Sequence, residues 1–380
     1  MKATTKTMIR PNGLRVRPAP ARWQLPCSST ECSLHQLSPY IGKIKSSIAA
    51  DLIERYSAPG DLVVDPFAGA GTIPFEAATR GRRALGADIS PYARILAQAK
   101  LAPPPSLDAA LALAEEALDE SARLPVPDLR EVPAWVRRFY HPKTLREALR
   151  FAEVCRRPGN EFLMACFLGI LHHQRPGFLS YPSSHLVPYL RTRQFPKQAF
   201  PEMYAYRPLR PRLLAKVRRS YRRFTMPQRR AVQPFRQTPV EQLTLPRQFG
   251  ALITSPPYMN ALDYGRDNRL RLWFIDPSLG EPVDNGVTQR RQAFVTAMSS
   301  LATKAERGLR PKGYCVYVVG EAIKRTFDGH PSEVVFSIMQ EQAPSLRLKT
   351  VMADQIPDVR RTRHECKGVK TEHILVFQRN

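Results

Sequence analysis

The sequence contains no continuous apolar run of the roughly 18 residues that a membrane-spanning helix requires. Its N-terminal segment, MKATTKTMIRPNGLRVRPAPARW, is basic and contains prolines, and it lacks the apolar centre of a secretory signal. We therefore expect a cytoplasmic protein without a membrane partner, in which residues 1–36 form a flexible basic arm.

Cysteine is scarce, with six residues in a chain of 380. So few cysteines exclude a disulfide-dense fold and are typical of a reducing compartment. Cys27, Cys32 and His35 lie close together, but a zinc site would need a fourth ligand at ordinary spacing, and the neighbouring sequence offers none. We therefore expect no metal ion.

Acidic residues are also fewer than basic ones. The sequence has 33 Asp and Glu and 58 Lys and Arg, which gives a formal net charge of +25. The imbalance is strongest between Arg191 and Arg230, where 13 basic residues accompany a single acid, Glu202. Such a surplus is typical of a protein that binds a polyanion, most often nucleic acid. The alternative is a generally basic surface that serves solubility alone.

What the sequence does contain is an alternation of strand and helix patterns. Apolar spacing predicts a helix over Ser46–Tyr56 and then a strand ending at Asp65. A second strand ends at Asp88, and a further helix begins after Ser90, a plausible N-cap. Strand–helix repeats of this length favour an α/β fold with a doubly wound, mostly parallel sheet.

This alternation is interrupted by a stretch of different composition. Residues 102–228 have the pattern of helices separated by proline-rich breaks, and strand-like segments return only afterwards, at FGALIT, GYCVYVVGEA, RLKTVMAD and HILVFQR. We therefore predict one α/β domain, formed by residues 37–101 and 229–380, with a mainly helical insertion at 102–228.

A glycine-bearing loop, DPFAGAGT, occupies Asp65–Thr72 between the first strand and its helix. Glycines there let the backbone approach a ligand closely. The spacing fits neither the G-x-G-x-x-G dinucleotide fingerprint nor the lysine-bearing loop that grips phosphates. Asp88 at the end of the next strand can accept hydrogen bonds from both hydroxyls of a ribose. The pattern indicates a nucleoside cofactor without a pyrophosphate, and the alternative is a strand–helix turn without function.

Three motifs carry a resemblance to a known family. VVDPFAGAGT resembles the F-x-G-x-G S-adenosylmethionine loop of the amino-group DNA methyltransferases, and TSPPY resembles their catalytic tetrapeptide, D/N/S-P-P-Y/F. LSPYIGKIKSSIAADLI, at 37–53, is similar to the family's upstream segment over the methionine end of the cofactor. The order, with a large insertion before S-P-P-Y, resembles the family's α group, and NALDYGRDNRLRLW resembles modification methylases of restriction systems.

The resemblance implies a Rossmann-like, seven-stranded sheet, S-adenosylmethionine as cofactor with S-adenosylhomocysteine as product, and double-stranded DNA as partner, recognised by the insertion. It also implies a bacterial or archaeal protein held at the nucleoid through DNA. A cognate restriction endonuclease is a candidate partner. The resemblance assigns cofactor binding to Tyr40, Lys43, Asp65, Pro66, Phe67, Gly69, Gly71, Thr72, Asp88 and Ile89, and catalysis to Ser255, Pro256, Pro257 and Tyr258. One departure is that the acid often found after the third strand, near the adenine, has no counterpart before Glu241.

The S-P-P-Y segment suits methylation of an exocyclic amino group, whose nitrogen is a poor nucleophile because its lone pair is delocalised. By the resemblance, Ser255 Oγ and the carbonyl of Ser255 or Pro256 hold its N–H bonds and aim the lone pair. The prolines fix φ and donate no N–H, and Tyr258 offers a face to a base swung out of the duplex. Serine in the first position is typical of cytosine-N4 enzymes, whereas adenine-N6 enzymes mostly carry aspartate.

We therefore expect a site-specific DNA methyltransferase that produces N4-methylcytosine. The alternatives are methylation of adenine N6 in DNA, methylation of an amino group in RNA, and a catalytically idle nucleic-acid-binding protein. Guanine-N2 RNA enzymes usually carry an RNA-binding module near the N-terminus, which the first 36 residues do not show. The intact glycine loop and tetrapeptide argue against an idle protein.

The insertion also carries RLLAKVRRSYRRF, which interleaves basic and aromatic residues. We predict a helix over Arg212–Phe224 that contacts DNA phosphates, which position a protein without reading sequence. The residues predicted to make these contacts are Arg212, Lys216, Arg218, Arg219, Arg222 and Arg223. The alternative is a solvated basic face.

Overall fold

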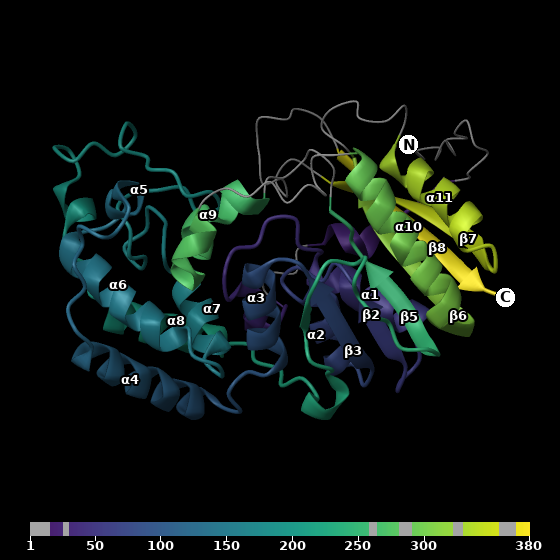
Figure 1. Ribbon diagram of the computed structural model, residues 1–380, viewed down its shortest axis with the longest axis horizontal. Coiled ribbons are helices and arrows are strands. Elements are labelled where there is room, and N and C mark those ends of the chain that lie inside the picture. Colours follow the sequence, from purple (N-terminus) through teal and green to yellow (C-terminus); the bar gives the residue numbers. More distant parts are fainter. Residues whose placement is uncertain (1–15, 26–29, 258–263, 281–290, 322–329, 357–369) are drawn as a thin grey trace.

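The computed structural model describes residues 16–25, 30–257, 264–280, 291–321, 330–356 and 370–380 of the chain. They form an eight-stranded sheet with the order β1-β7-β8-β6-β5-β2-β3-β4 (Figure 1). The strands are β1 (Val16–Pro18), β2 (Leu62–Asp65), β3 (Arg83–Asp88), β4 (Arg236–Gln237), β5 (Phe249–Thr254), β6 (Leu309–Gly320), β7 (Leu346–Ile356) and β8 (Lys370–Arg379). Only β8 runs antiparallel to its neighbours. The mostly parallel α/β sheet is confirmed, and β1 adds an eighth strand at its edge.

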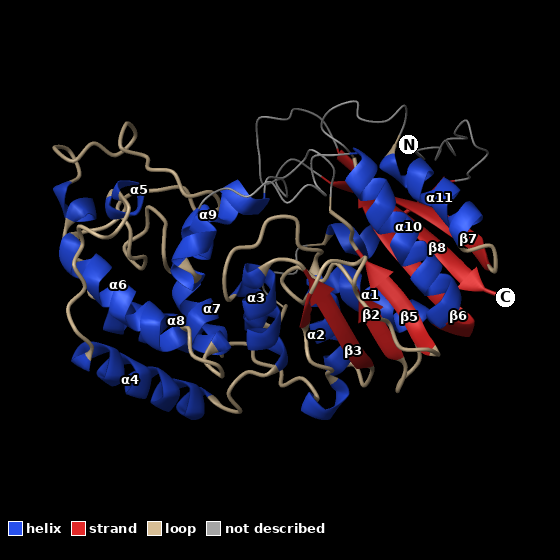
Figure 2. Cartoon of the chain, viewed as in Figure 1, coloured by secondary structure: helices blue, strands red, loops and turns tan. Residues whose placement is uncertain are grey.

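Helices cover both faces of the sheet (Figure 2). On one face, α10 (Arg291–Gly308) and α11 (Pro331–Gln342) share an apolar core with Val64. On the other, α1 (Ser46–Tyr56) and α2 (Thr72–Thr79) share a core with Val63. Because successive strand residues face opposite ways, a sheet covered on both sides needs continuous apolar strands such as LVV and ALI. Among the helices of the described residues, none is long and apolar enough to cross a membrane.

The carboxyl ends of β2, β3 and β5 lie together at one edge of the sheet. The register pairs Asp65 of β2 with Gly86 of β3, and Val64 of β2 with Leu252 of β5. From β2 the sheet continues through β3 to β4 on one side, and through β5 to β6 on the other. The strand order therefore reverses between β2 and β5, and open α/β sheets bind their ligands at such a point.

A helical unit lies beside the sheet (Figure 1). It comprises α4 (Leu107–Arg123), α5 (Ala134–Arg137), α6 (Pro142–Cys155), α7 (Glu161–Leu168), α8 (Leu209–Ser220) and, from beyond the S-P-P-Y segment, α9 (Tyr264–Ile275). Its apolar core is continuous with that of α3 (Pro91–Leu101), since Tyr92 and Leu96 pack in the same cluster as Phe167 and Phe274. The helical unit is therefore anchored on α3 through a shared apolar core. Its role in recognising DNA stays a prediction.

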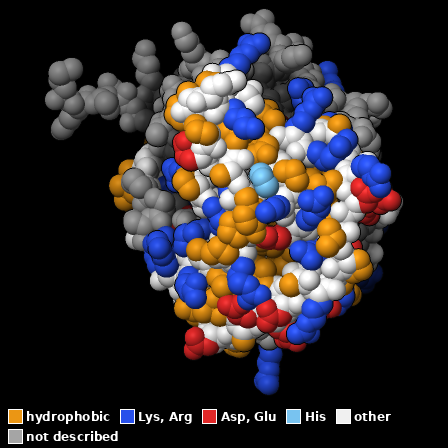
Figure 3. All heavy atoms as spheres, turned by 90° about the vertical axis from the view of Figure 1, so that its left-hand side faces the viewer, with side chains coloured by type: hydrophobic (Ala, Val, Ile, Leu, Met, Phe, Trp, Pro, Cys, Tyr) orange, Lys and Arg blue, Asp and Glu red, His pale blue; other side chains and the backbone are white. Residues whose placement is uncertain are grey.

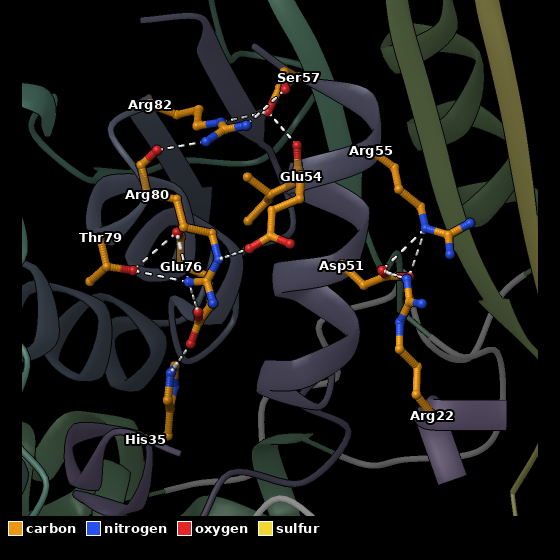
Figure 4. A network of polar contacts seen from close by, with 11 residues as sticks. Arg22, His35, Asp51, Glu54, Arg55, Ser57, Glu76, Thr79, Arg80 and Arg82 are labelled. Carbon is orange, nitrogen blue, oxygen red and sulfur yellow. Dashed lines mark hydrogen bonds and ion pairs between the residues drawn. The ribbon is translucent and has the colours of Figure 1, made fainter. Parts of the chain in front are cut away.

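The N-terminal arm is folded onto the sheet where the structure describes it, which corrects the prediction of a flexible segment over 1–36. Val16–Pro18 form β1 beside β7. Trp23 is 1% exposed, and its Nε1 donates a hydrogen bond of 2.8 Å to Asp51 Oδ2. Arg22 forms an ion pair with the same carboxylate (Figure 4). The buried indole of Trp23 and the pairing of β1 with β7 hold the arm against the protein. Its basic, proline-bearing composition does not predict either contact.

We expect Trp23→Phe to lower the free energy of unfolding by about 1.5 kcal/mol, because it removes a buried hydrogen bond to a charged group and keeps an aromatic ring. Urea unfolding measures this change. Combined with Asp51→Asn, the effects of the two substitutions should not add. Fully additive effects would mean that the hydrogen bond does not stabilise the fold.

Residues 30–45, which we call the strap, connect the arm to α1 and run along the helical unit. His35 is buried, and its Nε2 lies 2.6 Å from Glu76 Oε1 on α2. Glu76 is also paired with Arg80, which reaches Glu54 on α1 (Figure 4). Burial lowers the pKa of His35. The network ties the strap to α1 and α2, so that the strap is held over the carboxyl edge of the sheet.

Candidate active site

A cavity of about 950 Å³ opens at the carboxyl edge of the sheet. It lies where the loops after β2, β3 and β5 meet the strap and the helical unit. The predicted site residues that line it are Tyr40, Lys43, Asp65, Pro66, Phe67, Gly69, Thr72, Asp88, Ile89, Ser255 and Pro257. Gly71 and Pro256 are not part of its lining. Tyr258 lies outside the described residues.

The glycine loop has the backbone geometry that only glycine adopts without strain. Gly69 and Gly71 have φ angles of +48° and +72°. A Cβ on Gly69 would lie 3.0 Å from the ring of Tyr40, so the strap packs directly on the loop. A Cβ on Gly71 would lie 2.7 Å from that of Ala97 on α3. Gly71 therefore serves the close packing of α2 and α3, whereas Gly69 faces the cavity.

Asp88 fixes the loop from the neighbouring strand. Its Oδ2 accepts a hydrogen bond of 2.9 Å from the amide of Gly69, and its Oδ1 accepts one of 2.9 Å from Ser90. Burial raises the pKa of Asp88. Each carboxylate oxygen has a further lone pair, so the carboxylate can accept additional hydrogen bonds from a ligand in the cavity.

Asp65 connects β2 to the strand that leads into S-P-P-Y. Its Oδ1 accepts a hydrogen bond of 2.6 Å from Thr254 Oγ1 and a longer one of 3.3 Å from the amide of Phe67. Burial raises the pKa of Asp65 to about 7, and the negative charge of Asp88 acts in the same direction. The side chain thereby sets the spacing between the glycine loop and the first residue of the tetrapeptide.

The raised pKa of Asp65 has a consequence for stability. Between about pH 4 and pH 7 the folded chain retains a proton on Asp65 that the unfolded chain has lost, so stability falls as the pH rises through this window. Asp65→Asn keeps an acceptor for Thr254 but does not titrate. We expect the unfolding free energy of the wild type, relative to Asp65→Asn, to fall by at least about 1 kcal/mol between pH 5 and pH 8. A constant difference in urea titrations would contradict this assignment.

Several residues of the cavity were not predicted from the sequence. Tyr264, at the start of α9, contributes a ring whose centroid lies 6.1 Å from that of Tyr40. β4 reaches the cavity through Gln237, and the segment after β4 reaches it through Glu241. The amide of Thr238 donates to the Asp88 carbonyl over 3.1 Å. Glu241 is the first acid after β4 in the sequence, and Tyr264 lies in the family-like stretch NALDYGRDNRLRLW. The sequence therefore contained a signal for Glu241 and another for Tyr264.

The structure corrects the predicted DNA-binding helix in two respects. α8 ends at Ser220, not at Phe224, so Arg222 and Arg223 lie beyond it. Lys216 is only 8% exposed, and its Nζ donates a hydrogen bond of 2.6 Å to the carbonyl of Gln36 in the strap. Lys216 was predicted to contact a phosphate at the surface. It is instead buried between α8 and the strap.

Other basic side chains of this region are also engaged within the protein. Arg212 donates to the carbonyls of Pro208 and Pro176, at 3.0 and 3.1 Å, and Arg210 pairs with Glu115 and Asp119. Arg218 and Arg222 remain exposed, and Arg219 is half-buried. Lys and Arg side chains are spread over the outer face of the helical unit, with fewer acids among them (Figure 3). The net charge of the segment therefore overstates the number of cations available to a partner.

Residues 23–99, which contain the strap, α1, the glycine loop and Asp88, match the model of the N6/N4 DNA methylase family. Within residues 23–99 this chain is therefore similar to the amino-group DNA methyltransferases. The Type II methyltransferase M.MjaII of Methanocaldococcus jannaschii is 34% identical over 68 residues, a match that covers 18% of this chain and 13% of that relative. All ten predicted cofactor residues of this chain lie within the segment matched by the family model, whereas the insertion and S-P-P-Y lie outside it.

Among solved structures, TrmN from Thermus thermophilus is similar with 12% identity and a TM-score of 0.36, covering 91% of this chain and 52% of that chain. The geranyl diphosphate C-methyltransferase from Streptomyces coelicolor A3(2) is similar with 10% identity and a TM-score of 0.38, covering 96% and 90%. Similarity at this level carries no conclusion about the activity or the substrate of this protein.

Proposed function

We propose that the protein transfers a methyl group from S-adenosylmethionine to the exocyclic N4 of a cytosine swung out of double-stranded DNA. The observation that carries the proposal is the cavity at the switch point of the sheet. In it the glycine loop, Asp88 and Ser255 line one space, although Asp88 and Ser255 are 167 positions apart in the sequence. A nucleoside-binding loop next to an S-P-P-Y segment is the combination that this chemistry needs.

The residues of the cavity fit S-adenosylmethionine. Asp88 would accept the ribose hydroxyls, and the side chain of Ile89, 45% exposed, would cover a face of the adenine. Thr72 Oγ1 is buried and has no hydrogen-bond partner among the described residues, which leaves a polar atom for the ligand at the start of α2. Tyr40 and Lys43 would enclose the methionine end from the strap. Bound S-adenosylmethionine supplies an electrophilic methyl group on its sulfonium.

Ser255 and the following prolines would orient the nucleophile. Ser255 lines the cavity directly after β5, whose Thr254 is fixed to Asp65. Its hydroxyl and the carbonyl of Ser255 or Pro256 would accept the two N–H bonds of the target amino group and hold its lone pair toward the cofactor. Positioning of this kind accounts for most of the rate and needs no covalent enzyme intermediate. Tyr258 would stack on the extrahelical base.

The choice of base and partner follows from the same residues. Serine as the first residue of the tetrapeptide favours cytosine N4 over adenine N6. The net charge of +25 supports a polyanionic substrate, and the family of the matched segment supports DNA. We place the protein on the nucleoid in the cytoplasm, with the insertion recognising the target sequence and with a restriction endonuclease of matching specificity as a candidate partner.

The decisive experiment is modification-sensitive sequencing of DNA from cells with and without the protein, combined with mass spectrometry of the digested DNA. We expect N4-methylcytosine within one short sequence, present only when the protein is present. N6-methyladenine alone would overturn the base assignment and leave the mechanism of amino-group methylation intact. Unmodified DNA would overturn the proposed function.

A further inference from the structure

A second cavity, of about 630 Å³, lies between the strap and the helical unit, and we call it the basic cavity. Tyr40 and Lys43 line both this cavity and the cofactor cavity, so the two adjoin across the strap. Its other walls come from the loop after α7 and from α8. Ser255, Pro256 and Pro257, the described residues of the predicted catalytic tetrapeptide, do not line it.

Positive charge dominates the lining of the basic cavity. Lys43, Arg175, Lys216 and Arg219 all contribute to it, and none of the described residues that line it is acidic. Within the described part of the chain, Arg175, Lys216 and Arg219 form no ion pair with a carboxylate. The charges of Arg175, Lys216 and Arg219 face one space and repel one another, and an anion in that space would relieve the repulsion.

Lys216 is a buried residue of the wall of this cavity. Gly169, at the end of α7, allows Lys216 to pass, because a Cβ there would lie 3.1 Å from Lys216 Cε and 2.0 Å from the carbonyl oxygen of Leu37. The ammonium group donates to the carbonyl of Gln36, which offers no opposite charge. Burial, together with the charges of Arg219 and Lys43, lowers the pKa of Lys216 to about 8. A buried ammonium is costly unless something compensates it, so the site favours an anionic ligand.

The exposure and the chemistry of the lining residues indicate which class of anion would bind. Arg175 is exposed and Arg219 is half-buried, so the cavity can be reached from solvent, whereas Lys216 lies inside. Phe178 and His185 add aromatic walls to the cations. Burial lowers the pKa of His185 to about 4, so its ring is neutral at physiological pH. Cations beside uncharged rings suit a phosphodiester flanked by a sugar better than a free inorganic ion.

We propose that the basic cavity binds a backbone phosphodiester of the DNA strand next to the target base, an inference that rests on the proposed function. The neighbouring cofactor cavity receives the base, and the strap separates the two. The contact would hold the strand in register while the base leaves the duplex. Lys216, predicted as a surface contact, would act from the floor of this cavity, with Arg175 and Arg219 at its mouth.

The test uses the full chain with S-adenosylhomocysteine and a fluorescent DNA duplex, with affinity measured by anisotropy at several salt concentrations. Arg175→Gln combined with Arg219→Gln should weaken binding about tenfold at low salt, because charged hydrogen bonds to the phosphate are removed. It should also reduce the slope of log affinity against log salt by about one unit for each phosphate that the variant no longer binds. Unchanged affinity for S-adenosylmethionine in calorimetry checks that the variant is folded.

A matched control removes the same kind of charge elsewhere. Arg130 is exposed, pairs with Asp128 and does not line the basic cavity. Arg130→Gln, and its combination with Arg138→Gln at another exposed position, should leave the salt slope unchanged. An equal reduction in the control pair would show a general charge effect and overturn the assignment, as would an unchanged slope in the Arg175 and Arg219 variant.

A second arm locates the phosphate. Neutral methylphosphonate replaces, one at a time, the phosphates around the base identified by sequencing. At one position next to that base, replacement should weaken wild-type binding but weaken the Arg175 and Arg219 variant little further. Effects that add at every position would overturn the proposal. The salt slope is measured whether or not methylation occurs, so failure of the proposed function and failure of the basic cavity are separate results.

Discussion

Asp88→Ala should weaken the binding of S-adenosylmethionine at least about a hundredfold. The carboxylate of Asp88 lines the cavity at the end of β3, where it would accept two hydrogen bonds from the ribose. Hydrogen bonds to a charged group contribute about 1.5–3 kcal/mol each, and 1.4 kcal/mol corresponds to a factor of ten in affinity. The substitution also releases the Gly69 amide, which the Asp88 carboxylate holds at 2.9 Å. Titration calorimetry measures the affinity directly.

Two further variants separate the contributions of Asp88. Asp88→Asn retains an acceptor for the Gly69 amide and should show an intermediate loss of affinity, since only part of the ribose contact is removed. Glu161→Gln neutralises another acid of the same cavity, on α7, and should bind the cofactor like the wild type. Equal affinities for the wild type and Asp88→Ala would remove Asp88 from the cofactor site.

Ser255→Ala should lower the single-turnover rate of methyl transfer at least about tenfold while leaving cofactor affinity near that of the wild type. The hydroxyl of Ser255 would hold an N–H bond of the target amino group as the nitrogen becomes tetrahedral. Loss of such a hydrogen bond in the transition state costs about 1.4 kcal/mol or more, which is a factor of ten in rate. Rapid quenching with an excess of enzyme over DNA isolates this step from product release.

The comparison for Ser255 is a serine outside the cavity. Ser278→Ala, at an exposed position after α9, should react at the wild-type rate. Ser255→Thr keeps a hydroxyl and should recover part of the rate, which a purely structural role would not produce. Tyr258→Ala should also slow transfer, and a target base unpaired by a mismatch should bind more tightly because unstacking has partly been done. Full activity in Ser255→Ala would reject the proposed mechanism.

Local sequence was enough for the elements that end near the site. The helix predicted over Ser46–Tyr56 and the strand predicted over Phe249–Thr254 have these bounds in the structure. Ser90 caps α3 as predicted, accepting a hydrogen bond from the amide of Ala93. Caps, glycines and apolar runs act within a few residues, so their signals can be recognised without the rest of the chain.

The gathering of the predicted residues could also be expected, for a physical reason that is not local. Parallel strands all present their carboxyl ends at one edge, so loops that follow such strands must meet there. The glycine loop follows β2, Asp88 ends β3 and Ser255 follows β5, and all of them line one cavity. The α9 contribution was missed, because nothing in its own apolar pattern shows that Tyr264 would return to the same cavity.

The sequence by itself determined the fold class, the main elements of the sheet and the segment matched by the methyltransferase family, because these depend on periodicity and on short motifs. Only the tertiary structure decided which individual charged and aromatic side chains are buried. Trp23 is buried under α1, and Lys216 is buried against the strap although it lies in the most basic stretch of the chain. Burial depends on contacts between residues that are 28 and 180 positions apart, and a count of charges along the sequence contains no information about those contacts.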